Sequence, residues 1–306
     1  MIQSDGDRPR TQPARYRRRG VLKLFGGALG APFGIGATAY SLDRSYRDAD
    51  GDGIPDSIEQ SAAVDAWLTE LFGADQFEGL DADRRDLLLD VRYVGETTIA
   101  DKTKATIVDL FRENGIYLQW LEYPERYSRD WFEQEYGYNA KQILWSPRSF
   151  YHQTIERRLK NISFQLLVVP GLPDGPYHRK LYSPWTAFDG SESGGYVNGF
   201  NTGNRAVVTA RRTHESAAKL ILHEIAHYAV CHATDPANTG VMGTKEELDL
   251  MDDEWEALRS GLGAIRDTTG VDVMFRRCLW SGLRPSKFRL PEQLETGVDC
   301  AGCRTE

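Results

Sequence analysis

Two histidines and a glutamate in one short segment have the spacing of a catalytic metal site. The sequence from His223 to His227 reads His-Glu-Ile-Ala-His, so the two imidazoles are four residues apart. On a helix, side chains at this spacing share one face and can bind the same divalent cation. Glu224 lies beside them, where a carboxylate can take a proton from a metal-bound water. The spacing therefore predicts a zinc site with Glu224 as its base.

The residues around this motif favour a helix. Residues 217–230 are nearly all apolar apart from the motif, Thr213 suits the N-cap position, and Glu215 falls in the first turn. Two imidazoles and a carboxylate in such an apolar helix are costly to bury unless they bind a partner. This cost favours a bound metal over histidines that only fill a core.

A third zinc ligand is expected, because catalytic zinc sites commonly use three protein ligands and leave one position for water. His232 is the preferred candidate, and it requires the helix to end after His227 and the chain to turn back. Asp235 is a second candidate. Glu246 or Glu247, within a predicted helix, is a third, and it would be the arrangement of a gluzincin-type zinc peptidase.

Beyond the motif, residues 86–262 resemble the metzincin metallopeptidases. Those enzymes have the pattern H-E-x-x-H-x-x-G-x-x-H, then a turn that carries a methionine beneath the metal, then a final helix. Met242 stands at the methionine-turn position, and residues 248–258 predict the final helix. Ala229 or Val230 replaces the family's glycine, and His232 comes one residue early. The resemblance implies a zinc metalloendopeptidase that hydrolyses peptide or protein substrates.

The pattern upstream predicts strands and helices in alternation. Strand patterns occupy residues 86–93, 116–122, 164–169 and 206–210, and helical patterns occupy 100–114 and 147–160. Strand, helix, strand implies parallel pairing. With the resemblance, this predicts an α+β fold: a mixed twisted sheet of about four to five strands packed on two to three helices, then the motif helix, the methionine turn and a C-terminal helix.

Substrate contacts are expected just before the last predicted strand. Metzincins hold an extended peptide against an edge strand in this neighbourhood, so the resemblance implies Gly195 and Tyr196 as substrate-binding residues. A plain loop between two strands is the alternative.

The N-terminus has the pattern of an export signal. Arg18 and Arg19 precede a Gly-rich apolar run, and residues 37–39 are a small-residue cleavage site. We therefore expect residues 1–39 to direct twin-arginine export, to the cell surface or beyond it. Membrane association is expected only through an uncleaved signal.

The charge argues against nucleic acid as a partner. The net charge is −8, from 37 Lys and Arg against 45 Asp and Glu. Residues 1–39 hold 7 of the basic and 2 of the acidic residues, so the remaining chain has 30 against 43, a net charge of −13. A balance this acidic favours solubility and repels phosphate backbones.

An acidic loop after the signal matches a calcium-binding pattern. Oxygen ligands fall at loop positions 1, 3, 5, 9 and 12, which are Asp48, Asp50, Asp52, Asp56 and Glu59. Gly53 stands at position 6, where the turn is sharp. We expect residues 40–60 to form a calcium-stabilised linker, with a solvated acidic linker as the alternative, followed by a helical segment at 61–85 that contains an amphipathic helix at 61–72.

Four cysteines can fasten the C-terminal extension, residues 263–306, to the zinc helix. Two disulfides are the preferred arrangement outside the cell, and a four-thiolate structural zinc is the alternative. The residues are Cys231, Cys278, Cys300 and Cys303.

One alternative function comes from a different class. A calcium-stabilised surface binding domain could keep the metal site and lack turnover, and the missing glycine of the histidine motif is its main support.

Overall fold

The structure is a computed structural model that describes residues 47–266, with gaps at 145, 176–177, 184–194, 202, 212, 231–232, 234 and 236. The predicted export signal lies outside the described residues, as do residues 267–306 of the C-terminal extension.

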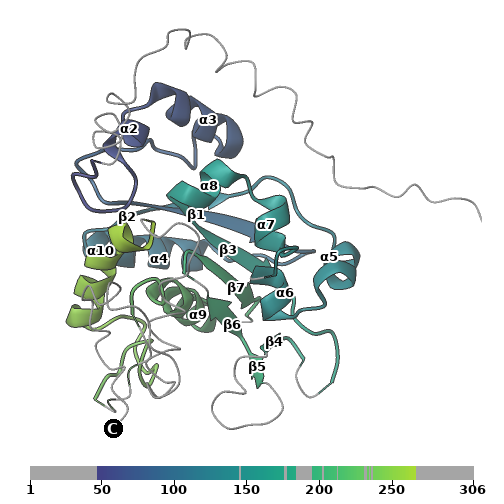
Figure 1. The fold of residues 1–306 in the computed structure, drawn as a ribbon. Helices are drawn as coiled ribbons and strands as arrows, with labels where there is room; N and C mark the ends of the chain where they lie inside the picture. Colours follow the sequence, from purple (N-terminus) through teal and green to yellow (C-terminus); the bar gives the residue numbers. More distant parts are fainter. Residues whose placement is uncertain are drawn as a thin grey trace, which may run out of the picture. The chain divides into compact units, whose positions relative to one another are not determined.

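A five-stranded sheet forms the centre of the described fold (Figure 1). Its strands stand in the order β2 (Tyr117–Glu122), β1 (Asp86–Tyr93), β3 (Ser163–Val169), β7 (Arg205–Thr209) and β6 (Gly199–Asn201). The first four strands pair in parallel, and β6 pairs antiparallel with β7 at the edge. The predicted mixed sheet is confirmed, since the four strands read from the sequence are present within one residue at each end.

Helices cover both faces of this sheet, which is why β1 is buried along all eight residues (Figure 1). Leu87 and Leu89 face a core shared with one set of helices: α4 (Asp101–Glu113), α9 (His214–Ala226) and α10 (Asp252–Arg266). Leu88 faces the second core, shared with a different set: α5 (Arg129–Tyr136), α6 (Ala140–Leu144), α7 (Phe150–Thr154) and α8 (Arg157–Ile162). The alternation follows from the two-residue period of a strand.

The helices differ from the sequence prediction in two places. The helix expected at 147–160 is divided into α7 and α8, because Ile155 and Glu156 between them have extended backbone angles. The helix expected at 248–258 begins later, at Asp252, and continues to Arg266. Its start is set by Glu254, whose side chain accepts a hydrogen bond from the Met251 N–H at 3.0 Å, as in a capping box.

Smaller elements flank the sheet. The amphipathic helix expected at 61–72 is present as α3 (Ala62–Phe72), preceded by the short α2 (Asp56–Glu59). Leu68 and Phe72 of α3 are buried in the second core. A separate two-stranded antiparallel sheet joins β4 (Leu181–Ser183) to β5 (Gly195–Val197).

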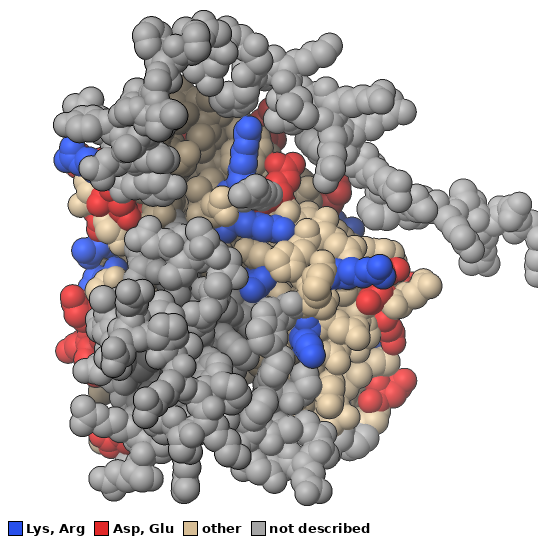
Figure 2. Space-filling view, in the orientation of Figure 1, with Lys and Arg blue, Asp and Glu red and all other residues tan. Residues whose placement is uncertain are grey.

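Charges of both signs lie on the described surface, and Figure 2 shows acidic and basic side chains on the same face. Within the described residues, Met251 is the large apolar side chain that is notably exposed, at 37%. In the same part of the chain, no helix combines the length and the apolar character needed to cross a bilayer.

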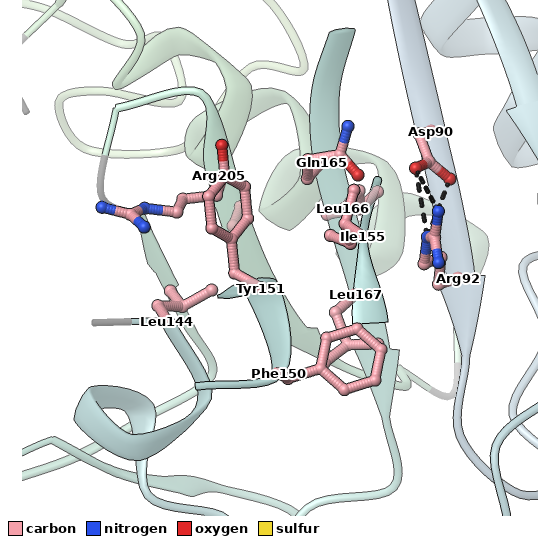
Figure 3. Close-up of a pocket in the computed structure, with 11 residues that line it drawn as sticks. Asp90, Arg92, Leu144, Phe150, Tyr151, Ile155, Gln165, Leu166, Leu167 and Arg205 are labelled. Atoms are coloured by element: carbon pink, nitrogen blue, oxygen red, sulfur yellow. Dashed lines mark hydrogen bonds and ion pairs between the residues drawn. The ribbon is translucent and has the colours of Figure 1, made fainter. Parts of the chain in front are cut away.

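A buried ion pair joins two residues of β1 on the face opposite α9. Arg92 donates three hydrogen bonds to the two carboxylate oxygens of Asp90, the shortest at 2.9 Å, and a further bond to the Tyr127 hydroxyl. Both side chains are almost completely buried. They line a small cavity with Phe150 and Gln165 (Figure 3).

Removal of the Asp90 charge should therefore destabilise the fold strongly. Asp90→Asn leaves the Arg92 guanidinium buried without a counter-charge, and we expect a loss of about 3–5 kcal/mol in the free energy of unfolding. Glu256→Gln is the matched control, because Glu256 is 71% exposed in its pair with Arg259 and should contribute less than about 1 kcal/mol. Urea denaturation measures the free energy of unfolding of both variants. An equal decrease in the two would show that the buried pair stabilises the fold no more than the exposed pair does.

Candidate metal centre

Helix α9 carries the His-Glu-x-x-His motif into the first core. Its N-cap is Thr213, whose hydroxyl accepts a hydrogen bond from the Ser216 N–H at 3.3 Å, as predicted. Ala218, Ile221 and Leu222 are buried against the sheet side of the core. The helix ends at Ala226, earlier than its apolar run suggested, and His227 is its C-cap.

The two motif histidines lie close together at the end of this helix. Their ring centroids are 4.6 Å apart with the planes at 76°. His223 is 6% exposed, so it lies inside the core rather than on the surface. The structure therefore brings both imidazoles to one place, as their four-residue spacing predicts.

Backbone carbonyls fix the orientation of both rings. His223 Nδ1 is 2.8 Å from the carbonyl oxygen of Val241, and His227 Nδ1 is 3.0 Å from that of Val230. A carbonyl oxygen can only accept, so each Nδ1 carries the proton. In a neutral imidazole the lone pair then lies on Nε2, which is the atom a metal would bind.

The turn after α9 forms without a glycine. Ala229 and Val230 donate backbone hydrogen bonds to the Ala226 carbonyl at 3.0 and 2.9 Å, which closes the turn tightly. Both residues are buried, and neither is among the described residues with positive φ. A glycine is needed only where the backbone is left-handed or the approach is close. In this structure the glycine at the close contact belongs to α10, because a Cβ on Gly261 would clash with Ala229.

Met242 lies in a tight turn that contacts the motif directly. It is 1% exposed in the same core as α9, and its carbonyl accepts from the Ala233 N–H at 2.9 Å. The preceding residue, Val241, supplies the carbonyl that orients His223. Met242 therefore lies in a turn, and the backbone of the residue before it orients His223.

The start of α10 holds this turn in place. Glu254 accepts a hydrogen bond from the Asn238 amide at 2.6 Å, and the Asn238 carbonyl accepts from the Thr244 N–H at 2.9 Å. Gly243 passes so near to Asn238 that a Cβ would clash with its carbonyl oxygen. Asn238 therefore links the helix to the turn.

Glu224 is buried beside the edge strand β6. It is 3% exposed, and a Cβ on Gly199 would clash with its carboxylate. Burial raises the pKa of Glu224 to about 8, and the charge of Lys245 acts in the opposite direction. The Asn201 side chain of the same strand donates to the Glu224 carbonyl at 2.9 Å, which satisfies one of the last carbonyls of the helix.

Sequence reasoning missed the contribution of β6. Gly199 and Asn201 touch Glu224, whereas the expected substrate residues Gly195 and Tyr196 lie in β5, paired with β4. The Asn198-Gly199 dipeptide is a turn signal that could have marked a separate strand after it.

The candidates for the third zinc ligand differ in their position and exposure. His232 lies outside the described residues, as do the four cysteines. Asp235 is exposed, and its carboxylate accepts from the Ala237 N–H at 2.8 Å. Glu246 and Glu247 are exposed and lie in a non-helical segment, so the helix predicted there is wrong. Neither glutamate therefore lies on a helix, as the gluzincin arrangement requires.

Comparisons with known proteins add little to this geometry. No protein-family model and no curated protein matches the sequence. Among solved structures, the chain is similar to archaemetzincin from Methanopyrus kandleri, with a TM-score of 0.40 and 15% identity over 58% of this chain and 96% of that one. Similarity at this level carries no functional argument, so the function has to follow from the site.

The role of the methionine turn can be tested through Gly243. Gly243→Ala should displace the turn because of its clash with Asn238, and the Val241 carbonyl would then no longer orient His223. We expect zinc binding to weaken by about 10–100-fold, the usual effect of losing a hydrogen bond that supports a ligand. Titration calorimetry measures it, with circular dichroism as a check on folding. Thr244→Ala, a change of an exposed side chain in the same turn, should leave binding unchanged.

Proposed function

We propose that the protein is a zinc-dependent peptidase that hydrolyses peptide bonds. The main support is a pair of hydrogen bonds in which Nδ1 of His223 and of His227 each donates to a backbone carbonyl. These bonds fix the orientation of both rings and make Nε2 the proposed ligand atom of each. Glu224, one residue from His223 and buried at the same helix end, supplies a carboxylate beside them.

The donor set fits zinc. Imidazole nitrogens are common zinc ligands, and the two rings are near enough to share one ion. His232 is the third ligand in this proposal, since the helix ends at Ala226 and the chain turns at 227–230, as a ligand shortly after the turn requires. Zinc bound there would supply a Lewis acid and an acidic bound water.

The chain's own residues then account for the proton transfers. Glu224 would accept a proton from the attacking water and pass it to the nitrogen of the leaving amine. A carboxyl group whose pKa is near neutral suits this role, and burial raises the pKa of Glu224 toward that range. A dication bound nearby would lower the pKa of Glu224, because its charge stabilises the ionised carboxylate.

Strand β6 is the best candidate for holding the substrate. It is the terminal strand of the described sheet, and it lies against Glu224 through Gly199. An extended peptide can pair with the outer edge of such a strand. Gly195 and Tyr196 lie in β5, the strand directly before β6 in the sequence, and remain proposed contacts for side chains of the substrate.

The remaining parts of the proposal come from the sequence. Twin-arginine export would take the protein to the cell surface or beyond, and the acidic composition of residues 40–306 disfavours nucleic acid.

Glu224→Gln should separate metal binding from catalysis. It keeps the shape of the side chain and both histidines but cannot take a proton, so we expect kcat to fall by roughly 10²–10⁴-fold with zinc content unchanged. Casein and a peptide library are suitable substrates. Glu215→Gln, at an exposed position in the first turn of α9, should leave activity unchanged. Wild-type protein that binds zinc and peptides without cleaving them would instead favour the surface binding domain.

That binding domain has lost its main support. The missing glycine suggested a damaged site, but the turn at 227–230 forms with Ala229 and Val230 in ordinary right-handed or extended backbone.

The third ligand can be identified by substitution. His232→Ala should weaken zinc binding more than the about 10–100-fold caused by loss of a supporting hydrogen bond. Glu246→Ala and Glu247→Ala should have no effect, because both side chains are exposed. Metal analysis of the three purified variants distinguishes the cases. Full zinc content in His232→Ala would move the ligand elsewhere, and loss in Glu247→Ala or Glu246→Ala would support the gluzincin arrangement.

A further inference from the structure

The acidic loop before α2 is folded into a compact turn. One carboxylate oxygen from each of Asp48, Asp50 and Asp52 lies within 4.8 Å of the others, and these residues are the cluster of metal-binding side chains found in the described part of the chain. The chain can close this tightly because Gly51 and Gly53 have φ of 78° and 85°, in the left-handed region. Gly53 therefore has the role predicted for position 6.

Backbone N–H groups hold the first carboxylate at the centre of the loop. Asp48 accepts hydrogen bonds from Gly51 at 2.8 Å and from Gly53 at 2.7 Å, through different oxygens. Asp52 accepts from Ile54 through one oxygen and from the Asp86 N–H through the other, at 2.8 Å. The loop backbone thus fixes the aspartates before any ion is bound.

Glu59, at position 12, is a buried carboxyl group without a hydrogen-bond partner among the described residues. It is 3% exposed, and neither carboxylate oxygen has a hydrogen-bond partner in the described structure. Burial raises the pKa of Glu59 to about 9, and the negative charges of Asp52, Asp50, Asp86 and Asp48 act in the same direction. Asp50 Oδ2 is likewise buried without a partner. A buried ionised group without a partner is costly, and a cation removes that cost.

Asp56, at position 9, does not join this group directly. Its carboxylate accepts from the Ala49 N–H at 2.9 Å and pairs with Arg47 at 3.3 Å. Position 9 of such loops often reaches the ion through a water, so this placement is compatible with the pattern.

We propose that Asp48, Asp50, Asp52 and Glu59 bind one calcium ion, separate from the histidine site. Four carboxylates offer only hard oxygen donors, which suit calcium and not a nitrogen-preferring or sulfur-preferring metal. Calcium accepts six to eight oxygens in flexible geometry, whereas magnesium demands a near-ideal octahedron. A twelve-residue loop whose last ligand is a glutamate of the following helix fits calcium better.

The bound ion would fasten α2 and α3 to the sheet. Asp52 is bonded to the backbone of Asp86 at the start of β1, and the Arg85 guanidinium donates to the Asp50 carbonyl at 2.8 Å. Ile54, inside the loop, is fully buried in the second core with Leu68 of α3. Calcium here therefore stabilises the sheet itself.

Calcium binding should raise the melting temperature of the full chain. After treatment with a chelator, addition of calcium to about a hundred times its Kd should raise Tm by roughly 5–10 °C. Calorimetry with calcium chloride gives the Kd directly. Absence of binding up to about 10 mM, ten times the weakest Kd of extracellular calcium modules, would overturn the proposal. An equal response to magnesium would also overturn the assignment to calcium.

Glu59→Gln tests the ligand set with opposite effects in two states. It should weaken calcium binding by about tenfold or more, while the metal-free variant should melt no lower than metal-free wild type, because a buried unpaired carboxylate is gone. Glu70→Gln, at an exposed position of α3, should change neither value. Unchanged calcium affinity in Glu59→Gln would contradict the site. His223→Ala should keep the full calcium response, since a lost response would place the ion at the histidines instead.

Discussion

The hydrogen bond between His223 Nδ1 and the Val241 carbonyl is the interaction on which the proposed site depends. It joins α9 to the turn of Met242, and that turn is held in its place by Asn238 and the first turn of α10. The helix brings the imidazole to the right place, but only the carbonyl determines which nitrogen carries the proton. Residues 238–254 therefore serve the site although none of their side chains is a proposed ligand.

Much of this arrangement was predictable from local patterns. Strands β1, β2, β3 and β7 and helices α3 and α4 follow the periodicity of their residues, and Thr213 caps α9 as its type suggests. These elements are long and their apolar residues repeat regularly, so the local signal agrees with the fold. The two histidines were predictable for the same reason, since four-residue spacing on a helix determines their common face.

Other parts depend on contacts that no local pattern contains. Strand β6 has three residues, and its place against Glu224 follows from pairing with β7. Residues 248–251 have a helical composition but are not helical, because Asp249 accepts a hydrogen bond from the Trp255 indole and Glu254 caps the helix at Met251. The split between α7 and α8 and the short α5 and α6 likewise reflect packing on the second face. Tertiary contacts override propensity in short segments of this kind.

The two proposed ion sites differ in how the fold handles charge. At the histidine site the proposed ligands on α9 are imidazoles beside an apolar core, and Glu224 is the one carboxyl group buried next to them on that helix. At the loop, carboxylates crowd together, and burial with mutual repulsion raises the pKa of Asp50 to about 7 and that of Glu59 to about 9. Imidazole nitrogen donors suit zinc, and clustered carboxylate oxygens suit calcium. Selection between the ions thus follows from donor chemistry that is already set by the sequence, while the fold decides only that the donors of each kind converge.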